Sequence, residues 1–359
     1  MNSLAANSIY LLGNEQPDWL DAPSMILMFA VLSVLAVLFL VGRMLKRQPE
    51  SIIEPAIVKT FNRRVTAWLF ITAILAIALL LQRSVTIVLF GLVSFWALRE
   101  FITMTPTRRG DHRTLFWTFF FFTPLQYVLI GLGRDFRGFD AEHGFDFYPI
   151  YSVMIPVYAS LLIPARIAFS GDPKRFLERT AKIQFGLLIC VYTLSYTPAI
   201  LDMQLVTYDV TSRDFIKWTG STTGLLVYFI VIVQVSDALQ FLWDKLLGQH
   251  VIAPTVNATK TWEGLVGGAL STSIIGAVIA WLLPVTPFLP IGAGAMSLLI
   301  AIMGAAGSMT MSAIKRDRGV KDYGTLVQGH AGILDRIDSV CFAAPVFFHV
   351  TRFYLERPL

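Results

Sequence analysis

Charged residues are scarce in this sequence. Asp, Glu, Lys and Arg together make up only 15% of the 359 residues, whereas 55% of the residues are hydrophobic. Soluble domains contain roughly 25% charged residues. The composition therefore excludes an ordinary soluble domain and predicts an integral membrane protein.

Cysteine is also scarce, and several familiar catalytic motifs are missing. The two cysteines, Cys190 and Cys341, both lie in apolar runs, which excludes a disulfide framework and favours buried, unreactive thiols. The sequence has no Walker-type phosphate loop, no G-x-S-x-G elbow and no H-E-x-x-H helix. Any chemistry must therefore come from other clusters of polar residues.

Long apolar runs are abundant instead. A helix needs about 20 apolar residues to cross the hydrocarbon core of a membrane, and ten segments approach this length. They are residues 24–41, 65–81, 84–98, 114–132, 148–165, 184–201, 219–235, 265–283, 291–311 and 339–350. We therefore predict an all-α, polytopic membrane protein with about ten transmembrane helices. Residues 1–210 form an N-terminal transmembrane region, and residues 211–359 form a C-terminal transmembrane region with two motif loops.

The basic residues indicate which way the chain faces. Lys and Arg collect in cytoplasmic loops, and ten spans divide the loops into two alternating sets. The loops after the first, third, fifth, seventh and ninth spans hold 22 of the 29 Lys and Arg residues, and the other set, with both termini, holds 7. We therefore expect the first set of loops in the cytoplasm and both termini on the opposite side.

Segment 312–339, after the ninth span, combines many charges with glycines. Asp335 and Asp338 are three residues apart, so both carboxylates lie on one face if the segment is helical. Two such carboxylates repel each other unless a cation lies between them, and Mg²⁺ prefers one or two carboxylates together with substrate phosphates. The basic side chains that can neutralise phosphate charge are Lys315, Arg316, Lys321 and Arg336. The segment therefore predicts a metal-assisted phosphate site.

A simpler interpretation is a solvated basic loop, in which Asp and Arg side chains pair with each other at the membrane surface. A topology anchor needs only Lys and Arg, however, and has no use for interleaved aspartates, glycines and a histidine. The cluster as a whole therefore favours a functional site. For His330 the role stays open between a general base or phosphate donor and a structural hydrogen-bonding residue.

The preceding loop of the same set holds further candidates. Asp237 directly follows an apolar run, where an unpaired charge is costly, so we expect a partner or a metal beside it. Asp244 is interpreted as a residue of the membrane interface. Arg99 and Glu100, which close the third span, are expected to pair with each other.

The run SAIKRDRGVKDYGTLVQGHAGILDRID resembles the C-terminal signature of the phosphatidate cytidylyltransferase family, also called CDP-diacylglycerol synthases. The positions that agree with the signature are Ser312, Lys315, Arg316, Lys321, Asp322, Gly324, Gly329, His330, Gly332, Asp335, Arg336 and Asp338. A second family motif is similar to this chain at Asp237, Gln240, Trp243, Lys245 and Gly248, and a third is similar to KTWEG at residues 260–264. The resemblance covers about the last third of the chain.

This resemblance implies a nucleotidyltransferase that converts CTP and phosphatidic acid to CDP-diacylglycerol and pyrophosphate. It implies Mg²⁺ as cofactor, held by Asp335, Asp237 and Asp338, and leaves open whether a monovalent cation joins it. The other residues to which it assigns catalysis or substrate binding are Lys321, Asp322, His330, Ser312, Lys315, Arg316, Arg336, Lys260 and Thr261. The expected location is a bacterial inner (plasma) membrane, with the lipid bilayer but no nucleic acid as a partner, and a homodimer stays open.

Several positions depart from the family pattern, among them Gln328, Ala331 and Asp244, and the most important departure lies just before the signature. Many members carry an aspartate where this chain has Ser308, and a hydroxyl is a poorer, uncharged ligand for Mg²⁺. A paralogue that acts on another lipid phosphate or is catalytically impaired therefore stays open as an alternative. From a different class, a membrane transporter is expected to carry charges in mid-span and in repeated halves, whereas these charges cluster in two loops on one side.

Overall fold

The computed structural model describes residues 19–46, 55–104, 108–133, 145–209, 214–320 and 332–356. Within these residues, each of the ten predicted spans coincides with one helix or a series of consecutive helices, except that residues 219–221 precede α11 and residue 283 follows α12. The first five are α2 (Ala22–Leu45), α3 (Pro55–Leu81), α4 (Arg83–Thr103), the series Arg109–Leu132 and the series Tyr148–Ala168. The other five are the series Phe176–Asp202, α11 (Thr222–Leu246), α12 (Trp262–Leu282), α13 (Pro290–Asp317) and α14 (Leu334–Leu355).

Eight helical segments in the described part of the chain are long and apolar enough to cross a membrane. The two others of the ten are α3, whose apolar part Val65–Leu81 is shorter, and α14, which has Asp335 in its first turn and Arg352 in its last. A chain with this many apolar helices of membrane-spanning length is an all-α, multi-pass integral membrane protein. The fold class predicted from the sequence is confirmed.

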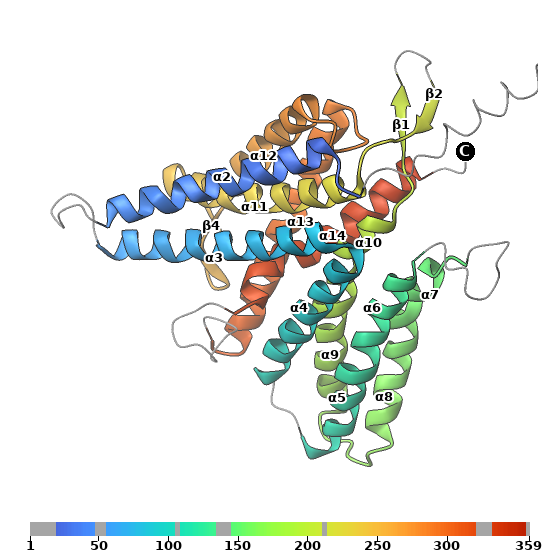
Figure 1. The fold of residues 1–359 in the computed structure, drawn as a ribbon. Helices are drawn as coiled ribbons and strands as arrows, with labels where there is room; N and C mark the ends of the chain where they lie inside the picture. The colour runs from blue at the N-terminus through green and yellow to red at the C-terminus, as the bar shows by residue number, and fades with distance from the viewer. Residues whose placement is uncertain are drawn as a thin grey trace, which may run out of the picture.

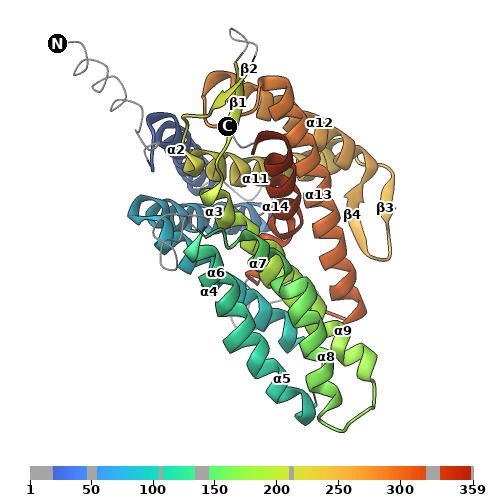
Figure 2. The same cartoon turned by 90° about the vertical axis from the view of Figure 1, so that its right-hand side faces the viewer.

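The helices form two groups that are inclined to each other (Figures 1 and 2). In the first group α2 packs against α3 and α11, and α11 packs against α12 and α13. The second group contains α4 and the helices that follow it up to α10 (Leu194–Ala199). α14 contacts both groups, through α10 on one side and through α11 and α13 on the other. The division at residue 210 stays a prediction, and α2 crosses it by packing on α11.

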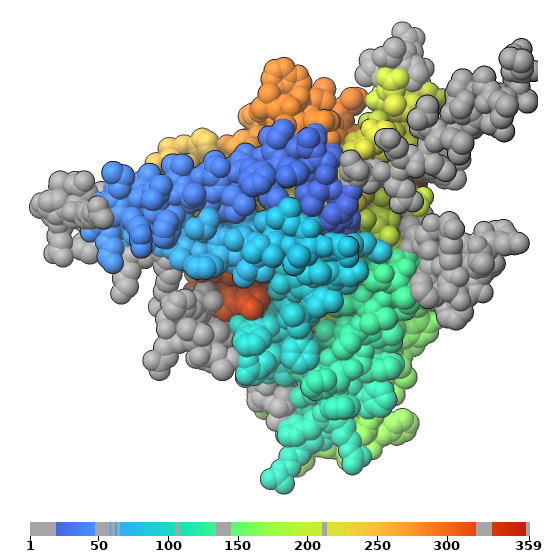
Figure 3. Space-filling view, in the orientation of Figure 1, coloured from blue at the N-terminus to red at the C-terminus, as the bar shows by residue number. Residues whose placement is uncertain are grey.

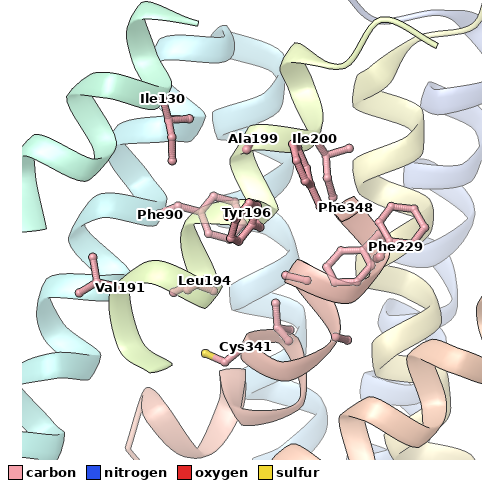
Figure 4. Packing of buried hydrophobic residues seen from close by; sticks show 14 of the residues in the cluster. Phe90, Ile130, Val191, Leu194, Tyr196, Ala199, Ile200, Phe229, Cys341 and Phe348 are labelled. Atoms are coloured by element: carbon pink, nitrogen blue, oxygen red, sulfur yellow. The ribbon is translucent and has the colours of Figure 1, made fainter. Parts of the chain in front are cut away.

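Aromatic side chains hold α14 between the two groups. Tyr196 of α10 is buried, and its ring centroid lies 5.0 Å from that of Phe348 in α14. On the opposite side Phe229 of α11 stacks on Phe347, with 4.9 Å between the ring centroids. Figure 4 shows Tyr196, Phe348 and Phe229 in this part of the core. Each aromatic pair contributes roughly 0.5–1.5 kcal/mol beyond the burial of its area, so α14 is fixed by both neighbours.

Two short antiparallel hairpins interrupt the helical fold, and the sequence analysis did not predict them. Their strands are β1 (Val206–Asp209), β2 (Asp214–Lys217), β3 (Val251–Ala253) and β4 (Asn257–Thr261). One hairpin precedes α11 and the other follows it, so they lie at the two ends of this helix (Figure 1). The β3–β4 hairpin connects α11 to α12 and therefore carries the chain between two of the motif segments.

Candidate functional site

Both ends of the charged segment 312–339 are helical rather than loop, because residues 312–317 belong to α13 and residues 334–339 belong to α14, which corrects the sequence-based interpretation. Lys315 and Arg316 lie in the last turn of α13, and Asp335 lies in the first turn of α14. α13 has 28 residues. At 1.5 Å per residue it exceeds the roughly 30 Å of the hydrocarbon core, so the helix continues beyond its apolar run.

Three predicted catalytic residues come between α13 and α14 in the sequence. Lys321, Asp322 and His330 fall outside the described residues, so the roles assigned to them stay predictions. Arg336, which the resemblance assigns to substrate binding, is half-buried in the first turn of α14.

An ion pair joins the ends of α13 and α14. Lys315 Nζ lies 2.7 Å from Asp335 Oδ1, and only 17% and 9% of the two side chains are exposed. The backbones come together at Gly307, where an added Cβ would lie 2.6 Å from the backbone oxygen of Asp338. Only glycine allows so close an approach. The crossing of the two helices therefore brings a predicted phosphate ligand into contact with a predicted metal ligand.

The motif that begins at Asp237 of α11 meets the charged segment 312–339 at this residue. Its Oδ1 accepts a hydrogen bond of 2.9 Å from the hydroxyl of Ser339, which is 102 residues away and follows Asp338 on α14. Asp338, next to Ser339 on α14, lies within range of the charge of Asp237, and the positive charge of Lys260 also reaches Asp237. The structure therefore brings two of the three predicted metal ligands together, beside a predicted substrate-binding lysine.

The β3–β4 hairpin docks on the end of α13. Asn257 Nδ2 donates a hydrogen bond of 3.2 Å to the hydroxyl of Ser312. Arg316 Nε donates a hydrogen bond, also of 3.2 Å, to the backbone oxygen of Val256. Two of the three predicted substrate-binding residues of α13, Ser312 and Arg316, are therefore held by the hairpin that precedes α12.

Asp244 anchors this hairpin to α11, so its interpretation as a residue of the membrane interface was wrong. Only 5% of its side chain is exposed. Its Oδ1 accepts hydrogen bonds from the backbone N–H and the hydroxyl of Thr261, at 2.9 and 2.8 Å, and its Oδ2 lies 3.9 Å from Lys260 Nζ. Gly264 leaves the space that the carboxylate needs, because an added Cβ would overlap it. Asp244 thus fixes both predicted substrate-binding residues of the KTWEG segment.

Replacing Asp244 by alanine is expected to lower the free energy of unfolding by roughly 1–3 kcal/mol, since the buried N–H of Thr261 loses its acceptor. The midpoint of thermal unfolding in detergent measures this effect. Asp244→Asn keeps an oxygen that can accept from the N–H, so it serves as the matched control and should lose less stability. Equal midpoints for the wild type and Asp244→Ala would show that the anchor is unimportant.

Glu100 is a residue near the site that the sequence analysis missed. It was expected to pair with Arg99, but the structure gives the two side chains different partners. Arg99 stacks over Trp96, with 5.2 Å from the guanidinium carbon to the ring centroid. The Glu100 carboxylate accepts hydrogen bonds from the backbone N–H groups of Ile333 and Leu334. The sequence signal was an ionisable residue at the end of a span, but nothing pointed to a partner 233 residues away.

These contacts bring together the end of α4, the β3–β4 hairpin, the end of α13 and the start of α14. The space-filling view shows surface of the α13–α14 part of the chain in an indentation between α3 and α4 (Figure 3). The N-terminal helices therefore border the site that the C-terminal motifs form. The cytoplasmic location of this site stays a prediction.

A bound metal is compatible with part of this arrangement. Among the described residues, no group of three or more His, Cys, Asp or Glu side chains is placed to hold a metal ion. Asp237 and Asp338 do lie together, and Mg²⁺ is commonly held by one or two carboxylates with substrate phosphates and waters as its other ligands. This pair therefore fits an ion that arrives with a nucleotide. The carboxylate of Asp335 is bonded to Lys315, and the three-aspartate metal site stays a prediction.

Comparison with known proteins identifies the family of the chain. Residues 62–354 match the family model described as the cytidylyltransferase family. YnbB of Escherichia coli (strain K12), a protein named as uncharacterized, is 33% identical over 290 residues, which cover 81% of this chain and 87% of that protein.

Two relatives carry the name phosphatidate cytidylyltransferase. The protein from Staphylococcus aureus (strain COL) is 33% identical over 185 residues, covering 49% of this chain and 70% of that protein. The protein from Synechocystis sp. is 37% identical over 129 residues, covering 35% and 43%. The family match includes most of the N-terminal region as well as all three motif segments. The chain therefore belongs to the cytidylyltransferase family, as a multi-pass integral membrane protein.

Proposed function

We propose that this protein transfers CMP from CTP to phosphatidic acid and so forms CDP-diacylglycerol and pyrophosphate. Family membership supports cytidylyl transfer, and the relatives named phosphatidate cytidylyltransferase support this lipid acceptor. The observation that supports the proposal is the hydrogen bond from Ser339 of α14 to Asp237 of α11, with Asp338 within range of the charge of Asp237. Carboxylates in this position, with the charge of Lys260 reaching Asp237, favour a phosphate-transfer site over the alternative interpretation of a solvated basic loop.

The reaction joins two anions. A phosphate oxygen of phosphatidic acid forms a bond to the α-phosphorus of CTP, and the bond from that phosphorus to the oxygen bridging to the β-phosphate breaks. Pyrophosphate leaves with the electron pair of the broken bond. Catalysis of such a transfer depends on positioning and on stabilising charge at the phosphate oxygens.

The described residues divide this work between them. Lys260, Lys315 and Arg316 are held at the helix ends by Asp244, Asp335 and the β3–β4 hairpin, so their positive charges are in place before substrate binds. Asp237 and Asp338 are the residues that would hold Mg²⁺, which when bound neutralises phosphate charge. The position of the site at the helix ends suits a lipid whose phosphate lies at the membrane surface and a nucleotide that arrives from water.

The proposal is tested with purified protein in mixed micelles that contain phosphatidic acid, CTP and Mg²⁺. We expect CDP-diacylglycerol and pyrophosphate to form in equal amounts. Parallel reactions with other lipid phosphates in place of phosphatidic acid define the acceptor. A lipid phosphate that reacts much faster than phosphatidic acid would identify the paralogue alternative instead.

Ser308 offers a separate test of whether the natural chain is catalytically impaired. It follows Gly307, the position of α13 that lies against Asp338. Because two carboxylates suffice for Mg²⁺, we expect Ser308→Asp to change the rate by less than about tenfold, or about 1.4 kcal/mol of barrier. Initial rates at saturating Mg²⁺ measure this, with Ser308→Asn as the uncharged control. A much larger gain in the aspartate variant alone would favour an impaired paralogue.

A further inference from the structure

α14 begins without a capping side chain of its own. Its N-cap residue is Ile333, which makes no side-chain hydrogen bond to the helix. The first backbone N–H groups of any helix have no partner within the helix. An unpaired N–H group is costly where water is excluded, and Leu334 is fully buried. The start of α14 therefore needs acceptors from elsewhere in the chain.

Glu100 of α4 supplies these acceptors. Its Oε1 accepts from the N–H of Ile333 at 3.1 Å, and its Oε2 accepts from the N–H of Leu334 at 2.9 Å. Only 5% of Glu100 is exposed. A buried carboxylate is tolerated when it is hydrogen-bonded, and the positive end of a helix dipole favours a negative charge at this place. Both oxygens of Glu100 therefore bind the first turn of α14.

The residues that follow this cap belong to the candidate site. Asp335 comes directly after Leu334 and forms the ion pair with Lys315 of α13. Asp338 follows about one turn later, beside Asp237 of α11. The direction of both α14 carboxylates depends on where the first turn of the helix is held. α13 contacts this turn through the side chain of Lys315, and α11 contacts Ser339 in the next turn, whereas α4 binds the backbone N–H groups at the start of the helix.

We propose that Glu100 is a positioning residue for the transfer reaction, which fixes the first turn of α14 so that Asp335 and Asp338 keep their working geometry. Glu100 acts through the backbone of α14 and does not itself contact substrate. Its effect on the rate rests on the proposed function, whereas its role as a cap can be tested without any assay of activity. In this arrangement α4, a helix of the N-terminal region, positions the site residues of the C-terminal motifs.

The first measurement is backbone hydrogen exchange of the peptide that contains Ile333 and Leu334, in the full-length protein. We compare the wild type with Glu100→Ala and Glu100→Gln. The matched control is Glu178→Gln, which changes a carboxylate to an amide on α9 (Phe176–Leu187), where Glu178 pairs with Lys182. Loss of a cap is expected to speed exchange by roughly tenfold in Glu100→Ala. Glu100→Gln should show a smaller increase because it keeps one acceptor oxygen, and Glu178→Gln should show none.

The second measurement is the rate of CDP-diacylglycerol formation by the same four proteins. We expect kcat to fall at least about tenfold in Glu100→Ala, while KM for CTP changes less than about threefold, because Lys260 and Arg316 are held by contacts that do not involve α14. The Mg²⁺ concentration that gives half the maximal rate should rise. A purely structural role would lower the amount of folded enzyme without changing this concentration.

The outcomes separate the inference from the proposed function. Unchanged exchange in both Glu100 variants overturns the cap and with it the proposal. Faster exchange with unchanged kcat and Mg²⁺ dependence overturns the positioning role. If the wild type forms no product with any lipid phosphate, the proposed function fails and the positioning role falls with it, while the exchange data still decide whether Glu100 caps α14. If Glu100→Ala does not fold, the comparison rests on Glu100→Gln, which preserves the shape of the side chain.

Discussion

The Asp335→Asn variant is expected to lose cytidylyl transfer by roughly 10²–10³-fold, the loss typical of removing one group that stabilises charge in a transition state. Asp335 and Lys315 form a largely buried ion pair, with 2.7 Å between Oδ1 and Nζ. An amide cannot balance the charge of the ammonium group, so Lys315 loses its fixed position at the end of α13. The single change therefore removes the carboxylate of Asp335, a predicted metal ligand, and also the fixed position of Lys315, a predicted phosphate ligand.

The control for this prediction is Asp317→Asn, at the end of the same helix. Asp317 pairs with its neighbour Arg318, and 67% of its side chain is exposed. Exposed ion pairs contribute little, so this variant should keep a rate close to that of the wild type. Initial rates and thermal unfolding are measured for both variants in the same detergent. If folded Asp335→Asn retains more than about a tenth of the wild-type rate, the ion pair with Lys315 is not part of the machinery.

The second prediction concerns the two carboxylates that converge from α11 and α14. Asp237→Asn and Asp338→Asn are each expected to lower the rate by roughly a hundredfold and to raise the Mg²⁺ concentration needed for activity. Because both side chains are expected to hold one ion, either change removes the site. The double variant should therefore be little slower than the slower single variant, since residues that act as a unit are not additive. Rates measured over a series of Mg²⁺ concentrations give all three comparisons.

The same variants are expected to be more stable than the wild type when no metal is present, although they are less active. The carboxylates of Asp237 and Asp338 repel each other in the absence of a cation, so removing either charge relieves that repulsion. Each single variant should therefore unfold at a higher temperature than the wild type when EDTA is present, while being less active when Mg²⁺ is present. The Asp237→Asn amide oxygen can still accept the hydrogen bond from Ser339. Multiplicative losses of rate, or lower unfolding temperatures in EDTA, would mean that the two carboxylates do not share an ion.

The helical spans could be predicted from the sequence because the cost of burying polar groups in a membrane imposes a strong constraint on each segment. All ten predicted spans coincide with helices to within three residues at their ends, and the end of α4, the β3–β4 hairpin and the start of α14 meet at one end of the helices. The ends of the helices were harder to place. Lys315 and Arg316 continue α13 beyond its apolar run, and hydropathy carries no information about where a helix ends in water.

The contacts of the site depend on long-range geometry that a single sequence does not contain. The motifs indicated that Asp237 and Asp338 belong to one site, and the structure places them together. The burial of Asp244 depends on the unpredicted β3–β4 hairpin and on the space left by Gly264. Glu100 looked like the partner of its neighbour in sequence, whereas its actual partners are backbone groups of α14. Every residue except proline has a backbone N–H donor, so the sequence does not indicate which N–H groups a side chain such as that of Glu100 will bind.

The most direct test of the proposed reaction follows the label of two CTP samples, one labelled in the α-phosphate and the other in the γ-phosphate. Each is incubated with the purified protein, phosphatidic acid and Mg²⁺, and the lipid and aqueous fractions are counted. We expect label from the α-phosphate in the lipid fraction and label from the γ-phosphate in pyrophosphate. A folded protein that moves no α-label into phosphatidic acid or any other lipid phosphate would contradict the account.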